Sequence, residues 1–441
     1  MTTHRLRDVA LVLTSNVDKV IDPNERTVRL CNYVDVYKNN FIRNDMPFKP
    51  GSATAAEIKK FGVQVHDVII TKDSETADEI GVPALVKSTA EDLVCGYHLS
   101  ILRADRRRMI GPFLYWHLLS KKSQEDFGNA ANGVTRFGLT LGGIKGIPVN
   151  VPDLATQRQI ADFLDRETAR IDLLIKKKQR LVALLAGKKE TLLDTAVCKG
   201  LSDTAEKKRS GVDWFGDVPA NWTVCRFNRL IASKVDYRGR TPEKVDEGVF
   251  LVTARNVRDG KIDYQRSEEY TTVEDWEKLS ARGKPRIGDV LFTTEAPLGQ
   301  VAQVDRTDVA FAQRIMKFRA NAALVSNDFL ALFMISASFQ RSLQLFSSGS
   351  TAAGIKSERL AHLFGLVPPE LDQAEIVAFV RRQIDHLDAL EAPINASIDR
   401  LKEYRSALIT AAVTGQIDVD TYTKSGTPDR HLDAIQEEMG A

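Results

Sequence analysis

Two stretches of the chain carry apolar residues that recur every seven positions, as expected for helices with one buried face. In the first stretch, one row is apolar except for its central position, with the members Leu164, Ile171, Lys178, Leu185 and Leu192. The matching row of the second stretch is entirely apolar, with the members Val380, Leu387, Ile394, Leu401 and Leu408. Helices with such stripes must bury them, and each stripe is the obvious partner of the other. The pattern predicts two long helices, residues 153–199 and 369–415, paired as an antiparallel coiled coil.

A proline lies inside the second of these predicted helices, at Pro393. Proline removes one backbone hydrogen bond, and its ring clashes with the preceding turn. We therefore expect a kink or a break near residues 389–393. The first helix contains no proline after Pro152, so the two helices need not be equally straight.

The two helical stretches belong to an internal repeat with a constant offset of 216 residues. Matching residues include Gln157 with Gln373, Ile160 with Ile376 and Phe163 with Phe379. Upstream the similarity is weaker. Residues 66–71 resemble 288–293 and residues 102–104 resemble 318–320, but the offset drifts between 216 and 222 residues. Such drift is typical of loops that differ in length between two copies of a domain. Each copy is therefore predicted to be a variable globular part followed by a helix.

The globular parts contain short strand-like runs separated by Gly, Pro and Asp turns, for example residues 67–71, 289–293 and 301–304. The sequence predicts an α+β protein with a pseudo-two-fold internal repeat and two mixed α/β domains joined by the long helices. The expected segments are a first domain at 1–152, a helix at 153–199, a linker at 200–212, a second domain at 213–368, a helix at 369–415 and a polar tail at 416–441.

Composition narrows the class of protein only moderately. With 43% hydrophobic and 27% charged residues the chain resembles an ordinary globular protein, and no apolar run approaches the roughly 20 residues of a membrane span. The first residues lack the pattern of a secretion signal, so we expect a cytoplasmic location and no membrane contact. Four cysteines stand far apart without CxxC spacing, and a net charge of +2 is too small to prove a nucleic-acid partner.

Several catalytic signatures are missing from the sequence. The only Pro-Pro pair, Pro368-Pro369, lacks the Asn or Asp and the aromatic residue of an adenine methyltransferase motif. The glycine and lysine runs at 142–146 and 187–189 do not complete a phosphate-binding loop, and the seven histidines include no HExxH zinc motif. We therefore expect no catalytic residues, no metal site and no cofactor in this chain.

The boundaries between the globular parts and the helices resemble a known family. Residues 354–415 combine Gly-x-Lys, Phe-Gly-Leu-Val-Pro-Pro, Gln-x-x-Ile and a long helix that closes in Ala-Val-Thr-Gly. Residues 135–200 look like the same boundary in the first copy, and residues 210–222 resemble the entry to a second recognition domain. Together these features are similar to the specificity subunits of type I restriction-modification systems. The first copy has no counterpart of residues 214–222, so the edge of its domain departs from the pattern.

The resemblance implies a non-catalytic DNA-recognition subunit with two target-recognition domains. Each domain would read one half of a bipartite, asymmetric sequence in double-stranded DNA, and the helices would keep the two domains apart. Two methyltransferase subunits would dock on the chain, restriction subunits would complete the nuclease, and the partners would bind S-adenosylmethionine, ATP and Mg. A coiled-coil interaction scaffold without DNA readout and a stand-alone DNA-modifying enzyme remain the alternatives.

Candidate DNA-binding residues lie in loops that offer hydrogen-bonding side chains, because base edges are read by such groups and phosphates are held by Lys, Arg and small hydroxyl residues. In the second domain the candidates are Tyr237, Arg238, Arg240, Thr241, Arg255, Asn256, Thr294, Gln313, Arg314, Ser350, Thr351 and Lys356. In the first domain the candidates are Lys72, Tyr97, His98, Asn132, Thr135 and Arg136. Asp73 and Glu75 lie close by and could accept a hydrogen bond from cytosine N4 or repel phosphate.

Overall fold

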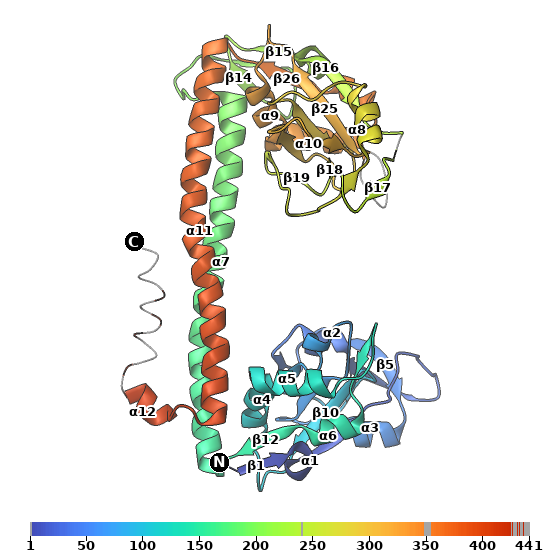
Figure 1. The fold of residues 1–441 in the computed structure, drawn as a ribbon. Helices are drawn as coiled ribbons and strands as arrows, with labels where there is room; N and C mark the ends of the chain where they lie inside the picture. Colours follow the sequence, from blue (N-terminus) through green and yellow to red (C-terminus); the bar gives the residue numbers. More distant parts are fainter. Residues whose placement is uncertain are drawn as a thin grey trace. The chain divides into compact units, whose positions relative to one another are not determined.

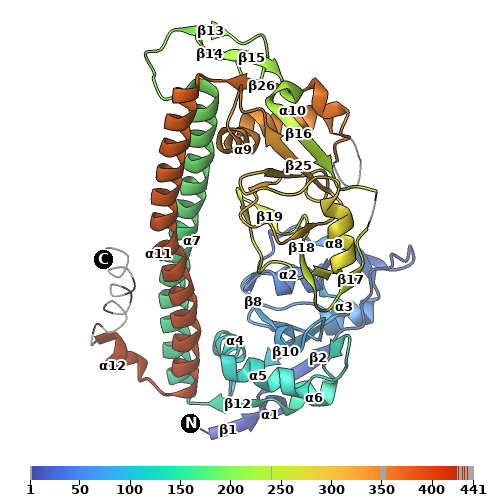
Figure 2. The same cartoon turned by 45° about the horizontal axis from the view of Figure 1, so that its top comes forward.

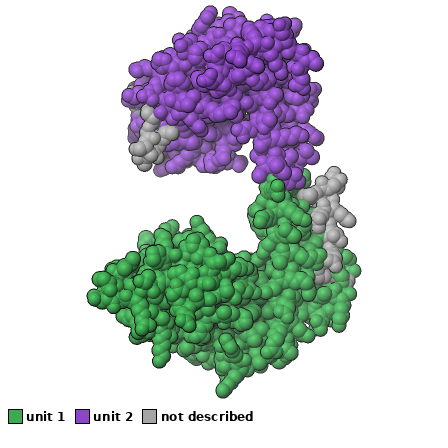
Figure 3. Space-filling view, turned by 180° about the vertical axis from the view of Figure 1, so that it is seen from behind, with its two compact units in different colours: residues 1–180, 393–441 green, residues 181–392 purple. Residues whose placement is uncertain are grey.

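The computed structural model describes residues 2–239, 241–347 and 354–424, together with residues 426, 430, 432 and 435. The chain forms two compact units (Figure 3). Unit 1 comprises Met1–Arg180 and Pro393–Ala441, and unit 2 comprises Leu181–Ala392. Each unit therefore contains one globular part and one section of each long helix.

The two long helices are α7, Leu154–Lys199, and α11, Glu370–Thr414. In each unit their sections run side by side in opposite directions, as Figure 1 and Figure 2 both show. In unit 1, Arg405 of α11 pairs with Asp172 of α7 at 2.9 Å. In unit 2, Lys189 of α7 lies 2.5 Å from Asp388 of α11. The predicted fold class, with two mixed α/β domains and an antiparallel pair of long helices, is confirmed.

The break expected near Pro393 is wrong, because α11 continues as one helix through this residue. The apolar residues on either side, Leu387 and Ile394, are buried. Burial of a leucine or isoleucine side chain contributes roughly 1.5–3 kcal/mol, which offsets the hydrogen bond lost at the proline. A bend at this position stays a prediction.

The globular part of unit 1 is built on a five-stranded sheet in the order β2-β10-β6-β8-β4 and a three-stranded sheet in the order β5-β3-β9. The bounds of these strands are β2 Ala10–Thr14, β3 Arg26–Cys31, β4 Phe41–Ile42, β5 Lys49–Ala53, β6 Val68–Thr71, β8 Pro83–Val86, β9 Leu93–Cys95 and β10 Leu99–Ala104. Short pairs are β1 Thr2–Arg5 with β12 Pro148–Val151, and β7 Asp73–Ser74 with β11 Phe137–Gly138. Its helices are α1 Leu6–Val9, α2 Tyr33–Tyr37, α3 Ala55–Phe61, α4 Gly111–Leu119, α5 Lys121–Ala130 and α6 Leu141–Gly146.

The globular part of unit 2 contains two four-stranded sheets, β16-β25-β22-β23 and β17-β21-β18-β24. Their bounds are β16 Ile231–Asp236, β17 Lys244–Val245, β18 Val249–Val252, β21 Tyr270–Thr271, β22 Val290–Thr293, β23 Val301–Gln303, β24 Ala310–Phe311 and β25 Ile315–Ala320. Two-stranded pairs are β13 Lys207–Arg209 with β14 Asp217–Pro219, β15 Thr223–Arg226 with β26 Phe364–Val367, and β19 Val257–Arg258 with β20 Lys261–Ile262. The helices are α8 Val273–Ser280, α9 Asn327–Ile335 and α10 Ala337–Phe346. The segment predicted as a linker, 200–212, thus contributes strand β13.

Hydrogen bonds at the start of each long helix repeat in the two copies. Gln157 accepts from the backbone N–H of Ile110 at 2.9 Å and donates to the carbonyls of Arg108 and Pro152. Gln373 makes the same three bonds, accepting from Ser326 at 2.9 Å and donating to Leu324 and Pro368. Both glutamines are buried. The duplication predicted from the sequence is therefore present in the detailed contacts of each copy.

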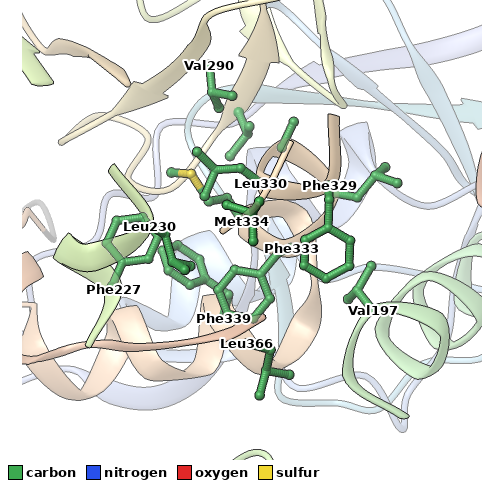
Figure 4. Close-up of a cluster of buried hydrophobic side chains, with 14 of the residues drawn as sticks. Val197, Phe227, Leu230, Val290, Phe329, Leu330, Phe333, Met334, Phe339 and Leu366 are labelled. Atoms are coloured by element: carbon green, nitrogen blue, oxygen red, sulfur yellow. The ribbon is translucent and has the colours of Figure 1, made fainter. Parts of the chain in front are cut away.

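Each helix section shares a hydrophobic core with its own globular part. In unit 2, Val197 of α7 lies in one cluster with Phe329 and Phe333 of α9 and Leu366 of β26 (Figure 4). In unit 1, Ile160 and Leu164 of α7 belong to the cluster that contains Phe113 and Trp116 of α4. The domain and the helix of one unit are therefore packed as a single body.

All four cysteines of the chain are free and buried. Cys31 and Cys95 are register partners on β3 and β9.

Across the part of the chain that the structure describes, no single helix has the length and hydropathy of a membrane span. The pair α9 and α10, bent by 67°, meets that criterion only when the two are taken together.

His117 of α4 is buried and hydrogen-bonded at both ring nitrogens. Its Nδ1 lies 3.1 Å from Ser123 Oγ, and its Nε2 accepts from the backbone N–H of Asn150 at 2.9 Å. An accepting Nε2 requires the neutral ring, and burial lowers the pKa of His117 from 6.5 to about 4. Because the folded-state pKa is depressed, the contribution of His117 to stability is full above about pH 6.5 and is lost as the pH falls toward 4.

We expect the variant His117→Phe to remove part of the acid sensitivity of unit 1. Phenylalanine suits the site because Phe333 occupies the matching position of the second copy. Between pH 7 and pH 5 the wild-type free energy of unfolding should fall by about 2 kcal/mol more than that of the variant. Urea unfolding at several pH values measures this difference. The exposed His386→Phe provides the matched control, and equal pH dependence in wild type and His117→Phe would contradict the assignment.

Candidate nucleic-acid interface

Three loops of unit 2 meet at the end of its first sheet, and we call residues 293–297, 312–314 and 354–356 the second loop cluster. The first two loops leave neighbouring strands, because Thr293 at the end of β22 pairs with Ile315 at the start of β25. The backbone N–H of Thr294 donates to the carbonyl of Arg314 at 2.8 Å, and that of Ile355 donates to the carbonyl of Thr294 at 3.0 Å. Backbone bonds therefore hold the three loops together whatever their side chains are.

Four predicted residues line one surface pocket of about 220 Å³ beside this cluster, namely Thr241, Arg255, Gln313 and Arg314. The hydroxyl of Thr241 donates to Gln313 Oε1 at 3.1 Å, which links a separate loop to the cluster. Arg314 Nε lies 3.2 Å from Glu295 Oε1, and both side chains are about half exposed. The structure thus gathers polar and cationic groups from four chain segments into a solvent-facing site.

Three predicted residues of the second domain are corrected by their burial. Tyr237 lies in the hydrophobic core, with its ring 5.4 Å from that of Phe311. The fully buried side-chain amide of Asn256 donates to the carbonyls of Asp263 and Ser267 at 2.8 Å. The buried hydroxyl of Thr294 donates to the carbonyl of Arg314 at 3.2 Å. These side chains satisfy the protein's own polar groups, so they are not available to DNA.

The remaining candidates of the second domain differ in what they contact. Arg238 is half-buried and its Nη2 pairs with Asp236 at 2.5 Å, while its Nη1 donates to the carbonyl of Ile355 at 3.3 Å. Its charge is therefore neutralised, and the side chain braces the second loop cluster. Lys356 is exposed at the edge of that cluster. The candidates Arg240, Ser350 and Thr351 lie outside the described residues.

Unit 1 contains the matching arrangement, and we call residues 72–75, 97–98 and 132–139 the first loop cluster. The backbone N–H of Lys72 donates to the carbonyl of His98 at 3.1 Å, and that of Leu139 donates to the carbonyl of Lys72 at 2.8 Å. In the second loop cluster the same bonds are made by Thr294, Arg314 and Ile355. Thr294 follows Lys72 at an offset of 222 residues, and the other two follow His98 and Leu139 at an offset of 216. His98 Nδ1 lies 2.6 Å from Asp73 Oδ2, where unit 2 has the pair of Arg314 and Glu295.

The first loop cluster brings all six predicted residues of the first domain into one region. The rings of Tyr97 and His98 are 3.7 Å apart at their centroids. Asn132 exchanges two backbone hydrogen bonds with Gly138, and Thr135 and Arg136 are exposed in the loop between them. Lys72 is half-buried beneath this loop. The six candidates are therefore close to one another in the folded chain, and their role in DNA binding stays a prediction.

Three residues near the sites were missed by the sequence analysis. Glu295 could have been found, because it follows Thr294 as Asp73 follows Lys72 in the first copy. Lys244 lines the pocket and lies 2.6 Å from Glu269. Lys19 places its Nζ 5.7 Å from the Tyr97 ring. No local signal marks the two lysines, since only the folded chain brings them to the sites.

A buried ion cluster fixes the strands that lead to the second loop cluster. Asp289, just before β22, accepts from Arg319 at 2.7 Å and from Lys317 at 3.1 Å, both on β25. Burial would raise the pKa of Asp289, but hydrogen bonds from Arg319, the backbone and Lys317 outweigh it, so this pKa lies below its usual range. The first copy has the same ion pair between Asp67 and Arg103, at 2.7 Å. In both copies an ion pair thus ties together the two neighbouring strands that lead to the loops.

The described residues contain no group of three or more His, Cys, Asp and Glu side chains that could hold a metal ion. What the two copies share is a pair of neighbouring inner strands whose ends carry exposed polar and basic loops joined by backbone hydrogen bonds. This arrangement defines a duplicated binding protein whose two sites have one backbone design and different side chains.

Comparison with known proteins identifies this class. Residues 17–183 and 244–400 match the family described as "Type I restriction modification DNA specificity domain". These two matches cover more than half of the chain, and the chain belongs to this family.

Two curated relatives and one solved structure are similar over long stretches. The EcoBI specificity subunit of Escherichia coli is 22% identical over 275 residues, which are 60% of this chain and 58% of that relative. The EcoKI specificity subunit of Escherichia coli strain K12 is 20% identical over 87% of this chain and 81% of its own. A chain from a solved structure that describes complex assembly and conformational transition of the type I R-M system aligns with a TM-score of 0.66 at 18% identity. That alignment covers 93% of this chain and 97% of the other, which shows a common fold.

We expect Asp289→Ala to destabilise unit 2 strongly, because it leaves Lys317 and Arg319 charged without their carboxylate. Breaking a buried ion pair by removing one partner costs about 3–5 kcal/mol. The matched control is Asp308→Ala, which removes the exposed partner of Arg306 and should cost less than about 1 kcal/mol. Urea unfolding of both variants measures the difference. A similar cost for the two substitutions would show that the buried cluster does not hold the sheet.

Proposed function

We propose that this chain is the DNA-recognition subunit of a type I restriction-modification complex and reads a bipartite, asymmetric target in double-stranded DNA. The observation that carries this proposal is the pair of loop clusters, which share their backbone bonds but differ in side chains. Asp73 and His98 stand in one cluster where Glu295 and Arg314 stand in the other. Two sites of one design with different chemistry suit two different half-sequences. Membership of a DNA specificity family supports the same conclusion.

The exposed groups around the clusters have the chemistry that DNA recognition requires. Arginine, glutamine and carboxylate side chains can read base edges in the major groove, whereas lysine and further arginines hold phosphates. In this proposal Gln313 and Arg314 take the first role. The exposed Arg255, Lys356 and Arg136 suit the second role.

We further propose that two methyltransferase subunits dock on the helices and that restriction subunits then complete the nuclease. The surface of α7 in unit 2 supports this docking, because Leu184 is 62% exposed although the apolar stripe of the helix is already paired. A groove of about 690 Å³ follows this surface, lined by Ala183, Leu184, Gly187, Lys188, Thr191, Leu192, Thr195, Ala196, Gly200, Leu201, Asp203 and Phe379. A groove that exposes apolar side chains such as Leu184 suits a protein-protein contact.

Catalysis belongs to the partner subunits in this proposal. S-adenosylmethionine would supply the methyl group for adenine, and ATP and Mg would serve the restriction subunits. This chain would contribute recognition and assembly, without a cofactor or metal of its own. The expected cytoplasmic location is part of the same proposal.

Exchange of residues 213–368 for the corresponding domain of another specificity subunit should alter one half of the methylated sequence and leave the other half unchanged. The reason is that unit 2 carries its own loop cluster and its own core. A methylation map of DNA exposed to the assembled complex measures the outcome.

The reciprocal exchange of residues 1–152 is the control, and it should alter the other half only. Methylation without a two-part motif, or a change of both halves after one exchange, would contradict the proposal. Loss of all DNA binding by the intact complex would favour a scaffold without DNA readout.

A further inference from the structure

Arg314 occupies a backbone conformation that a non-glycine residue rarely adopts, with φ at +81°. Such a conformation is strained and persists where the surroundings enforce it, typically at functional sites. The surroundings here are the hydrogen bonds that the carbonyl of Arg314 accepts from the N–H and the hydroxyl of Thr294. Glycine would adopt this conformation without strain. The presence of arginine therefore points to a need for its side chain.

Among the described residues, the guanidinium of Arg314 pairs with Glu295 and remains accessible. Glu295 engages the Nε atom at 3.2 Å, and 48% of the Arg314 side chain is exposed. Glu295 itself is fixed, because its backbone bridges to Gly354. A carboxylate at Nε orients the planar fork while leaving its outer edge for a ligand.

The surroundings of Arg314 suit the edge of a base more than a phosphate. It lines the pocket with Thr241 and Gln313, which offer hydroxyl and amide groups, and the carboxylate of Glu295 disfavours a phosphate at the same point. Guanine presents two acceptors, O6 and N7, in the major groove, and a bidentate arginine is the commonest specific contact to them.

We propose that Arg314 reads a guanine in the half-site of unit 2 and that Glu295 is the positioning residue that orients its guanidinium. This inference rests on the proposed function. In unit 1, His98 and Asp73 occupy the equivalent positions, with the same backbone bonds. An imidazole has no bidentate fork, so this position distinguishes the two half-sites.

The test uses the full chain assembled with its partner subunits and a library of duplexes in which each base pair of the unit 2 half-site is varied. The wild-type complex should prefer guanine at one position by on the order of 10- to 100-fold. Arg314→Lys should abolish this preference, because lysine keeps the charge but not the fork. Preferences at the other positions should not change. Arg306→Lys is the matched control, since Arg306 is an exposed arginine that is also paired with a carboxylate.

Glu295→Gln tests the positioning role separately. It should weaken the preference at the same position only, and in the double variant with Arg314→Lys it should cause no further loss there. A residue that only stabilises the loop would instead lower binding to every sequence. If the complex with Arg314→Lys does not assemble, the base preference of Glu295→Gln still tests the inference.

Two results would overturn the inference. In one, Arg314→Lys preserves the preference for guanine at every position of the half-site. In the other, Arg314→Ala lowers affinity uniformly across the library and reduces the slope of log affinity against log salt by about 1, which is the behaviour of a phosphate contact. Failure of the proposed function would look different, because the wild-type complex would then show no sequence preference at all.

Discussion

Burial of the apolar stripes of α7 and α11 in the cores of the two units is the interaction on which the other features depend. Stripe residues nearest a globular part, such as Leu164 and Leu408, belong to the same hydrophobic cluster as its side chains, and Val197 of α7 likewise lies with Phe329 and Phe333. A buried Val, Leu or Phe side chain contributes roughly 1.5–3 kcal/mol, so rotation of a helix against its domain would expose several such groups at once. The domain of each unit is thereby fixed to its helix section.

A rigid body of this kind allows the loops to vary. The loops of each cluster are joined by backbone hydrogen bonds, such as those from Thr294 to Arg314 and from Lys72 to His98, which do not depend on side-chain identity. Behind them, Asp289 and Asp67 tie neighbouring strands through buried ion pairs. Side chains at the surface can therefore differ between the copies without disturbing the fold. The two loop clusters thus combine a constant backbone with variable side chains.

The sequence predicted the helices well, but it could not tell which of the candidate site residues are buried. The expected helix 153–199 differs from the observed α7 by one residue at its start, and 369–415 differs from α11 by one residue at each end. The break at Pro393 was wrong, since burial on both sides sustains the helix. At the site, residue type alone did not show that Asn256 is buried whereas its neighbour Arg255 is exposed. The side-chain amide of Asn256 donates to a backbone carbonyl of the protein itself.

The amino-acid sequence by itself determined the duplication and the long helices. Helical periodicity and a constant offset are local or linear properties, so they can be read without knowing which segments meet. Only the tertiary structure decided which loop side chains are exposed and which partners they have. The pairing of Arg314 with Glu295 and the approach of Lys19 to Tyr97 depend on strands far apart in the chain coming into register. That register is set by packing of the whole core, which no single segment encodes.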